Sequence, residues 1–235
     1  DIEQTKKMVD TFIEQGFNYF DTAHGYTDSE EKIGLALSDV RKDIIISTKS
    51  PAKDKKTLLE QVQMSLERMK TDYIDILQLH NPDVLPDPED PDSTYGGLLE
   101  AKKKGWVRHI GITNHSLARA VAAVKSGKYE TIQYPFSSLA TDEEVELTRL
   151  AKQEDVGFIA MKGLSGGLIT NAATTFSFIK QYDNVVPIWG IQRESELLEF
   201  IEMEKNPPAY DDAMKALIEK DRRELAGNFC RGCGY

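Results

Sequence analysis

The strongest constraint on the fold is a regular alternation between short β-forming runs and longer segments with helical periodicity. In residues 58–69, for example, apolar positions recur at steps of three and four residues, which places them on one face of a helix. Strands that alternate with helices predict repeated βα units and a parallel sheet. The sequence predicts seven strands, at residues 18–20, 44–48, 74–79, 109–112, 131–134, 156–160 and 184–188.

This order predicts an α/β protein with the fold of a (β/α)8 TIM barrel. The first element is a helix at residues 4–15, so we expect the first strand of the barrel to be missing from the given chain. An open, doubly wound parallel sheet is the alternative. We expect the barrel to span residues 1–205, and residues 206–235 to form a helical segment leading into a truncated, Cys-rich tail. The proline-rich residues 81–91 are predicted to form a loop.

The charge and hydropathy of the chain limit the kinds of molecule that it could bind. The 235 residues carry a formal net charge of −10, which disfavours binding to nucleic acid or to anionic membranes. No apolar stretch approaches the roughly 18 residues that cross a bilayer, and the first residues do not resemble a secretion signal. We therefore expect a cytoplasmic protein that acts on a small molecule. No heptad or large apolar stripe indicates a particular oligomeric state.

Polar residues close three of the predicted strands. Asp21, Lys49 and His80 each follow an apolar run, and Tyr26 lies in the loop after the first of these runs. In βα barrels the catalytic groups lie at the carboxyl ends of the strands. Taken alone, each residue has an ordinary structural explanation, such as a helix cap, a surface lysine or a packing aromatic. Their occurrence together favours a catalytic group.

The motifs around these residues resemble those of the aldo-keto reductases. The resemblance lies in residues 20–26 (FDTAHGY), 47–49 (STK) and 75–80 (DILQLH), and residues 108–114 (RHIGITN) resemble the family's fifth-strand signature. It implies reduction of an aldehyde or ketone by a nicotinamide cofactor, with Tyr26 as proton donor. Lys49 would favour loss of the phenolic proton, Asp21 would position Lys49, and His80 would orient the carbonyl.

The same resemblance implies a set of cofactor-binding residues. Amide and hydroxyl groups would hold the nicotinamide carboxamide, and a glycine-rich loop would approach the diphosphate closely. Met161 stands where many members of the family have an aromatic residue that stacks on the nicotinamide. The implied residues are Thr113, Asn114, Gln133, Met161, Lys162, Gly163, Leu164, Gly166, Gly167, Gly190, Gln192, Arg193 and Glu196.

The segment that would bind the adenosine departs from the family pattern. It lacks the lysine and the later arginine that many relatives use on a 2′-phosphate, and Glu196 stands in the place of that arginine. A carboxylate repels a phosphate and can accept a hydrogen bond from a ribose hydroxyl. NADPH is the cofactor that the resemblance implies, and Arg193 is the one cation left in this segment that could recruit it; NADH is an open competitor because of Glu196.

Two cysteines, Cys230 and Cys233, lie near the end of the sequence. Their spacing is found in metal and iron–sulfur sites, but two thiolates alone complete neither a zinc site nor a cluster. The chain also resembles aldo-keto reductases with a ferredoxin-like C-terminal extension that carries a [4Fe–4S] cluster. A longer chain could then supply the other ligands, whereas a redox-inert tail is the structural alternative.

Two further functions are compatible with the same motifs. A nicotinamide-binding sensor or regulatory subunit would keep the barrel without turning over a substrate. An electron-transfer protein would exchange electrons between the nicotinamide and a C-terminal cluster. The four residues Asp21, Tyr26, Lys49 and His80 favour the reductase.

Overall fold

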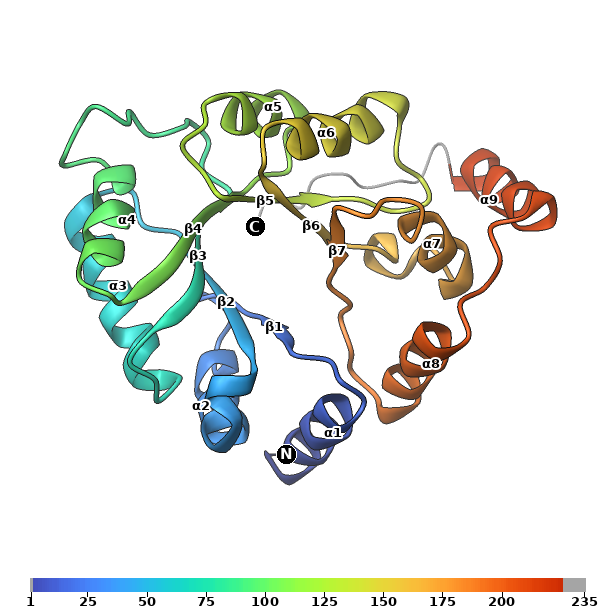
Figure 1. Ribbon diagram of the computed structural model, residues 1–235, viewed down its shortest axis with the longest axis horizontal. Coiled ribbons are helices and arrows are strands. Elements are labelled where there is room, and N and C mark those ends of the chain that lie inside the picture. The colour runs from blue at the N-terminus through green and yellow to red at the C-terminus, as the bar shows by residue number, and fades with distance from the viewer. Residues whose placement is uncertain (1, 226–235) are drawn as a thin grey trace. The chain divides into compact units, whose positions relative to one another are not determined.

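A computed structural model describes residues 2–225 of the chain, which divides into two compact units. The first unit contains the residues up to Asn114 and Ser126–Thr131. The second contains His115–Lys125 and the residues from Ile132 onward. In both units helices alternate with strands, as the sequence predicts (Figure 1).

The first unit holds the first four strands and their helices. The strands occur in the spatial order β1-β2-β3-β4 and pair in parallel, so consecutive strands are neighbours, and the order does not reverse as it would in a doubly wound sheet. The elements are α1 (Ile2–Glu14), β1 (Tyr19–Asp21), α2 (Ser29–Leu37), the 3-10 helix η1 (Ser38–Asp43), β2 (Ile45–Ser50), α3 (Lys55–Arg68), β3 (Ile74–His80), α4 (Thr94–Lys103) and β4 (Val107–Thr113).

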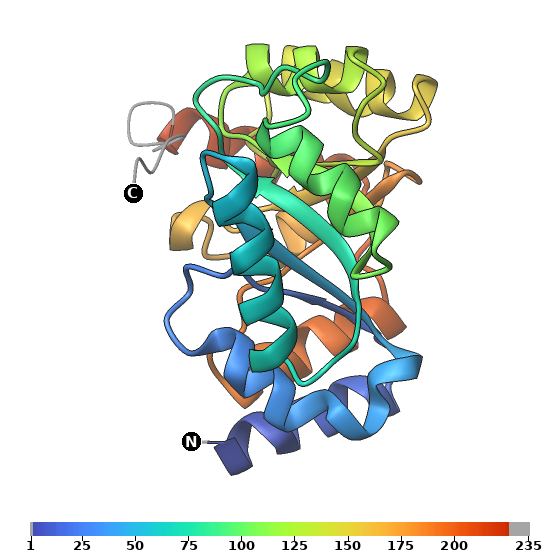
Figure 2. The same ribbon diagram turned by 90° about the vertical axis from the view of Figure 1, so that its left-hand side faces the viewer.

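One face of this four-stranded sheet is apolar and packs on helices. Successive side chains of a strand point to opposite faces, so every second residue faces the helices. Helix α3 contacts β2, and α4 contacts both α3 and β4; α3 and α4 lie side by side over the strands (Figure 2). The strands contribute the buried residues Ile46, Leu77, Leu79, Ile110 and Ile112, and the two helices contribute Leu58, Val62, Leu98 and Ala101.

The opposite face of the same strands is largely polar. The register pairs Asp21 with Ser47, Lys49 with Gln78, and His80 with Thr113, so all of these residues share one face. The face away from the helices therefore concentrates the polar residues that close the strands.

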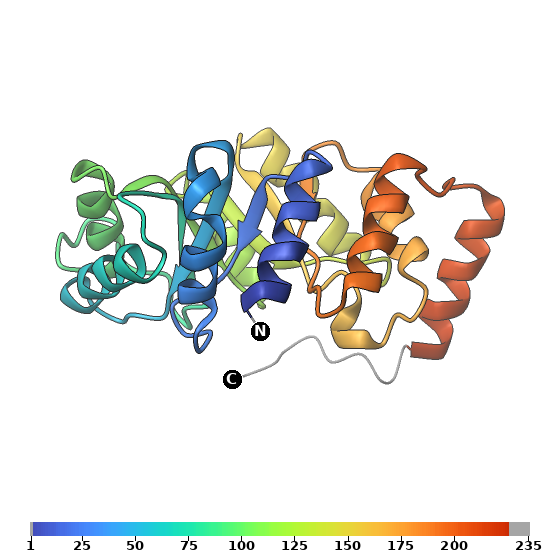
Figure 3. The ribbon, with the colours of Figure 1, turned by 90° about the horizontal axis from the view of Figure 1, so that it is seen from below.

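Local sequence signals begin and end the helices of this unit. The Asp54 carboxylate accepts a hydrogen bond from the backbone N–H of Thr57 (2.9 Å), which caps α3. Beyond the end of α4, Gly105 has a φ of +75°, the left-handed conformation that glycine adopts without strain. The predicted loop lies between β3 and α4, and α1 packs beside α2 (Figure 3).

The second unit contains the last three strands, in the order β5-β6-β7. Trp189 stacks on Phe200 with ring centroids 4.4 Å apart, and the buried Phe176 and Met203 belong to the same cluster. Its elements are α5 (Leu117–Lys125), β5 (Thr131–Pro135, whose first residue belongs to the first unit), α6 (Asp142–Gln153), β6 (Gly157–Met161), the 3-10 helix η2 (Ser165–Gly167), α7 (Ala172–Ile179), β7 (Val185–Pro187), α8 (Glu194–Lys205) and α9 (Asp212–Leu225).

The structure confirms all seven predicted strands, with their ends shifted by one or two residues. It also confirms the helix at the start of the chain, which spans Ile2–Glu14. Within residues 2–225, every helix is too short or too polar to cross a bilayer.

Candidate active site

Three of the four predicted catalytic residues lie on neighbouring strands of the first unit. Asp21 is the last residue of β1 and His80 is the last residue of β3. Lys49 lies one residue before the end of β2, so this strand is longer than the sequence pattern indicates. Because the strands are parallel and in register, the three side chains come to one edge of the polar face.

An ion pair between Lys49 and Asp21 forms the centre of the group. The Nζ atom of Lys49 donates to Oδ2 of Asp21 at 2.5 Å and to the carbonyl oxygen of Thr22 at 2.6 Å. The lysine side chain is 1% exposed and the aspartate side chain 10% exposed, so little water screens the pair. The ammonium is thereby fixed in position by two acceptors on the segment that leads to Tyr26.

Asp21 also changes the pKa of Tyr19, which lies two residues earlier on β1. Burial, and then the negative charge of Asp21, raise the pKa of Tyr19 above its ordinary value. Tyr19 is therefore a neutral phenol at every pH at which the protein would work. The second carboxylate oxygen of Asp21, Oδ1, is buried and has no hydrogen-bond partner among residues 2–225.

Tyr26 lies on the loop between β1 and α2 and completes the group. Its ring centroid is 5.4 Å from Nζ of Lys49 and 5.7 Å from the ring centroid of His80, with the two rings nearly perpendicular. Backbone bonds hold the turn, since the N–H of Tyr26 donates to the carbonyl of Ala23 at 3.0 Å. The Tyr26 side chain is 45% exposed, so the phenol borders solvent, whereas the lysine is enclosed. The structure thus brings all four predicted residues together.

Thr113 and Asn114 follow His80 around the same edge. Thr113 ends β4, and its hydroxyl accepts a hydrogen bond from the backbone N–H of Asn81 at 3.1 Å. The Nδ2 atom of Asn114 donates to the carbonyl of Pro82 at 3.1 Å, and the side chain is fully buried. Both residues are therefore held by the loop that follows His80.

In the second unit, Gln133 and Met161 lie on β5 and β6. Nε2 of Gln133 lies 3.8 Å from the sulfur of Met161, and both side chains are buried. A thioether at the end of β6 is an apolar, polarizable surface of the kind that covers an aromatic ring face.

Several residues of the segment after β6 have a left-handed backbone conformation. Lys162, Ser165, Gly166 and Gly167 all have positive φ angles, between 50° and 92°. Backbone N–H groups in turns of this kind can form anion sites; here those of Ser165 and Gly167 donate to the carbonyls of Lys162 and Leu164 at 2.7 and 2.9 Å. The Nζ atom of Lys162 is buried and has no hydrogen-bond partner in the described part of the chain. A buried, unpaired ammonium beside such a loop fits a diphosphate.

Gly163 and Leu164 complete this loop. A Cβ atom at Gly163 would overlap the indole ring of Trp189, so a larger residue does not fit there. The carbonyl of Leu164 accepts the N–H of Gly167 at 2.9 Å, which closes the turn. The loop conformation is therefore fixed by its own backbone and by one neighbouring aromatic ring.

Gln192 and Arg193 lie between Gly190 and the start of α8, and Glu196 lies in the first turn of this helix. The Glu196 carboxylate accepts the backbone N–H of Gln192 at 2.8 Å and that of Arg193 at 3.1 Å. The N–H of Gln192, followed by that of Arg193, lowers the pKa of Glu196. Its side chain thus occupies N–H groups at a helix N-terminus, a place that otherwise attracts phosphate.

No group of three or more potential metal ligands of the His, Cys, Asp and Glu types occurs in residues 2–225. Cys230 and Cys233, the candidate metal ligands, lie outside the described residues.

Three residues in the hydrogen-bond network around the group were not identified from the sequence: Thr22 bonds to Lys49, Glu30 to Thr48, and Arg68 to His24. Thr22 contributes only its carbonyl oxygen, and a backbone atom leaves no residue-type signal. Glu30 and Arg68 meet behind the Tyr26 loop, although they lie on different helices. Glu30 is visible as an acidic residue in the first turn of a helix, but that position normally indicates only a favourable helix dipole.

The fold and the site together define a parallel α/β protein with a tyrosine, lysine, aspartate and histidine group at the carboxyl ends of its strands. The chain belongs to the aldo/keto reductase family, whose family model matches residues 1–184. It is 33% identical over 172 residues to the methylglyoxal reductase DkgB of Escherichia coli O157:H7, an alignment that covers 68% of this chain and 61% of that protein. The first curated relatives are matched over only 52% to 61% of their own length.

Solved structures show the same fold at lower sequence identity. The holo form of aldo-keto reductase AKR11C1 from Bacillus halodurans superposes with a TM-score of 0.79 at 21% identity, covering 94% of this chain and 88% of that one. An aldo-keto reductase from Klebsiella pneumoniae in complex with NADPH gives a TM-score of 0.78 at 17% identity, covering 93% and 84%. These likenesses confirm the (β/α)8-barrel class predicted from the sequence.

Proposed function

We propose that the protein reduces an aldehyde or ketone with a reduced nicotinamide cofactor, and that Tyr26 donates the proton. The observation that carries this proposal is the enclosed Lys49 ammonium, which is held by Asp21 and lies 5.4 Å from the Tyr26 ring. Membership of the aldo/keto reductase family supports the same activity.

When bound, a reduced nicotinamide would supply a hydride for the carbonyl carbon, and the protein would supply a proton to the carbonyl oxygen. Tyr26 borders solvent, so its hydroxyl can meet a substrate. The Lys49 ammonium stabilises the phenolate that remains after proton transfer, because it is buried and little water screens its charge. His80, whose ring lies edge-on to that of Tyr26, donates a hydrogen bond that orients the carbonyl. The phenolate recovers its proton from solvent.

Tyr26→Phe tests the assignment because it removes only the hydroxyl. We expect carbonyl reduction to fall by about 10²- to 10⁴-fold, the usual contribution of a positioned general acid, while cofactor affinity is retained. The matched control is Tyr210→Phe in the second unit, which should keep its turnover. Undiminished turnover by Tyr26→Phe would contradict the proposal. If the wild-type protein binds the cofactor but no aldehyde or ketone causes it to oxidise that cofactor, the sensor or regulatory function is favoured instead.

The predicted cofactor residues up to Gly167 divide into three sets by chemistry. Thr113, Asn114 and Gln133 would hold the carboxamide, Met161 would cover the nicotinamide ring, and the loop from Lys162 to Gly167 would bind the diphosphate. The positive φ angles of this loop and the unpaired ammonium of Lys162 support the last assignment. Lys162→Met should weaken cofactor binding, measured directly by fluorescence titration.

NADH competes with NADPH as the cofactor because of Glu196. Its carboxylate already binds two N–H groups at the start of α8, and it adds a negative charge where relatives bind a 2′-phosphate. Glu196→Gln should therefore improve the Kd for NADPH more than the Kd for NADH. Equal or tighter binding of NADPH by the wild-type protein would contradict a preference for NADH.

Cys230 and Cys233 remain candidates for two ligands of a [4Fe–4S] cluster, with the other ligands supplied by further sequence. The resemblance to aldo-keto reductases with a ferredoxin-like extension supports this. Iron analysis of the anaerobically purified longer chain tests it, and a colourless, iron-free protein would contradict it.

A further inference from the structure

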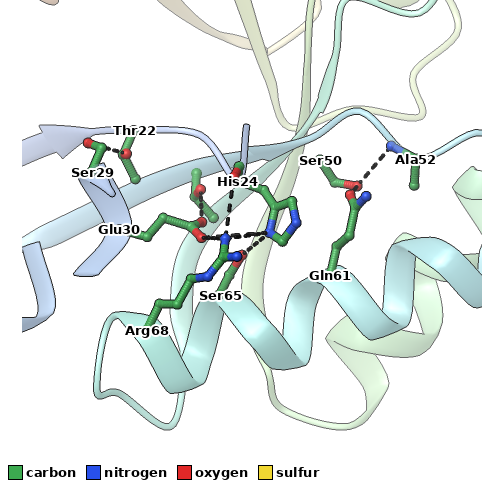
Figure 4. A network of polar contacts seen from close by, with 10 residues as sticks. Thr22, His24, Ser29, Glu30, Ser50, Ala52, Gln61, Ser65 and Arg68 are labelled. Carbon is green, nitrogen blue, oxygen red and sulfur yellow. Dashed lines mark hydrogen bonds and ion pairs between the residues drawn. The ribbon is translucent and has the colours of Figure 1, made fainter. Parts of the chain in front are cut away.

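His24, two residues before Tyr26, belongs to a polar network that the proposed mechanism does not use (Figure 4). Its central residues are His24, Glu30, Ser65 and Arg68, which we call the loop clamp. His24 lies on the Tyr26 loop, Glu30 on α2, and the other two on α3. The clamp therefore joins the loop to both helices that flank it.

Arg68 is the donor at the centre of the clamp. Its Nη1 atom lies 3.4 Å from each of three acceptors, which are the carbonyl oxygen of His24, Nδ1 of His24 and Oε2 of Glu30. An arginine nitrogen is always protonated and cannot accept, so Nδ1 of His24 must be the acceptor. Ser65 Oγ lies 3.3 Å from the same nitrogen. The guanidinium thus fixes both the backbone and the ring of His24.

Glu30 extends the clamp to the strand that carries Lys49. Its side chain is only 2% exposed, and its Oε1 accepts a hydrogen bond from the hydroxyl of Thr48 at 2.7 Å. Thr48 directly precedes Lys49, and the carbonyl of Lys49 accepts the backbone N–H of His24 at 2.9 Å. A buried carboxylate requires such partners, because it has no water to solvate it.

A close contact between helices makes the clamp possible. A Cβ atom at Gly34 of α2 would overlap the carbonyl oxygen of Arg68, at the end of α3. Only glycine permits this approach. Glu30 lies about one helical turn before Gly34, so the contact places its carboxylate beside the Arg68 guanidinium.

Burial, rather than the charges of the clamp, favours a neutral His24. Burial lowers the pKa of His24, the Glu30 carboxylate raises it, and the Arg68 guanidinium lowers it. A neutral imidazole can accept a hydrogen bond from Arg68, whereas a protonated Nδ1 would lose that bond and face Oε2 of Glu30 at 3.7 Å instead. The clamp is therefore complete when His24 is unprotonated.

We propose that Arg68 and Glu30 are positioning residues for the reduction, because they hold the Tyr26 loop against the strand that carries Lys49. The inference rests on the proposed function. Neither residue touches the reacting atoms. They act on Tyr26 by two routes. The first is His24, which lies inside the turn closed by the hydrogen bond from Tyr26 N–H to the Ala23 carbonyl. The second is the start of α2, where the N–H of Ser29 donates to the Tyr26 carbonyl at 2.8 Å.

Arg68→Gln tests the clamp by removing its central donor. A small misplacement of a catalytic group costs about 10²-fold in rate, so we expect kcat to fall by about 10- to 100-fold. KM for the carbonyl and Kd for the cofactor should change little, because the clamp binds neither. Arg68→Lys keeps the charge beside Glu30 but not the fork of donors, so kcat should lie between those of Arg68→Gln and the wild type.

Since Arg68→Gln leaves the Glu30 carboxylate buried without its cation, the double variant Glu30→Gln/Arg68→Gln guards against misfolding. It removes both charges and should fold, but it should keep the low kcat. The matched control is Arg149→Gln, which breaks an exposed arginine–glutamate pair on α6 and should leave kcat unchanged.

Hydrogen exchange gives a readout that does not depend on turnover. In Arg68→Gln and in the double variant, the amides of His24, Tyr26 and Ser29 should exchange at least about tenfold faster, while those of β3 stay protected. Unchanged exchange at these amides, or unchanged kcat in an active protein, would overturn the proposal. If the wild-type protein reduces no carbonyl, the proposed function fails, and the exchange data still decide whether the clamp holds the loop.

Discussion

The pair formed by Lys49 and Asp21 leads to a quantitative prediction about stability. Lys49→Met keeps most of the side-chain volume and removes the ammonium. Asp21, which is 10% exposed, then loses its cation at 2.5 Å, and its other oxygen already has no hydrogen-bond partner among residues 2–225. Breaking a buried ion pair by removing one partner costs about 3–5 kcal/mol of unfolding free energy. We expect a loss in that range.

Neutralising both partners should cost less than removing one. In Lys49→Met/Asp21→Asn no buried charge is left alone, so the double variant should be more stable than Lys49→Met, and the two effects should be strongly non-additive. The surface pair of Lys102 and Glu130 provides the control, since its N···O distance is 2.6 Å but both side chains are more than a third exposed. Lys102→Met should cost only about 0–1 kcal/mol.

Urea unfolding monitored by tryptophan fluorescence measures these differences. The chain has two tryptophans, Trp106 in the first unit and Trp189 in the second. In a Trp189→Phe background the signal comes from Trp106 alone and reports on the unit that contains the ion pair. A loss in Lys49→Met no greater than that in Lys102→Met, or purely additive losses in the double variant, would refute the burial argument.

Two further predictions concern the same unit. Burial lowers the pKa of His24. The stability that the neutral form contributes is therefore present above the ordinary pKa of about 6.5 and is lost as the pH falls through the lowered value. Between pH 7.5 and 5.5 the wild type should lose more unfolding free energy than His24→Gln, and equal losses in the two proteins would contradict this. A Cβ atom at Gly111 would overlap Oγ1 of Thr131. Gly111→Ala should therefore cost about 1–3 kcal/mol, part of which Thr131→Ala should restore, whereas Gly25→Ala, with open space around its Cβ position, should be nearly neutral in urea unfolding.

The catalytic residues could be predicted from the sequence because their positions depend on where each strand ends. Asp21 and His80 each follow an apolar run, and a parallel sheet brings the ends of neighbouring strands to one edge. The end of β2 was misplaced by two residues, since Lys49 and Ser50 are polar but still pair with β3. The hydrophobic pattern ends at Thr48, whereas backbone hydrogen bonds determine where the strand ends.

The loop clamp could not be found in the same way, and the reason is physical. Arg68 is the last residue of an amphipathic helix, where a basic side chain normally interacts with the helix dipole and solvent. Its contact with His24 spans 44 residues and depends on the missing side chain of Gly34, which no periodicity reveals. Strand order therefore places the lysine and the aspartate, whereas close packing of α2 against α3 places the loop that carries the tyrosine. Variants of the clamp should thus separate catalytic rate from cofactor affinity, which variants of the cofactor-binding loop cannot do.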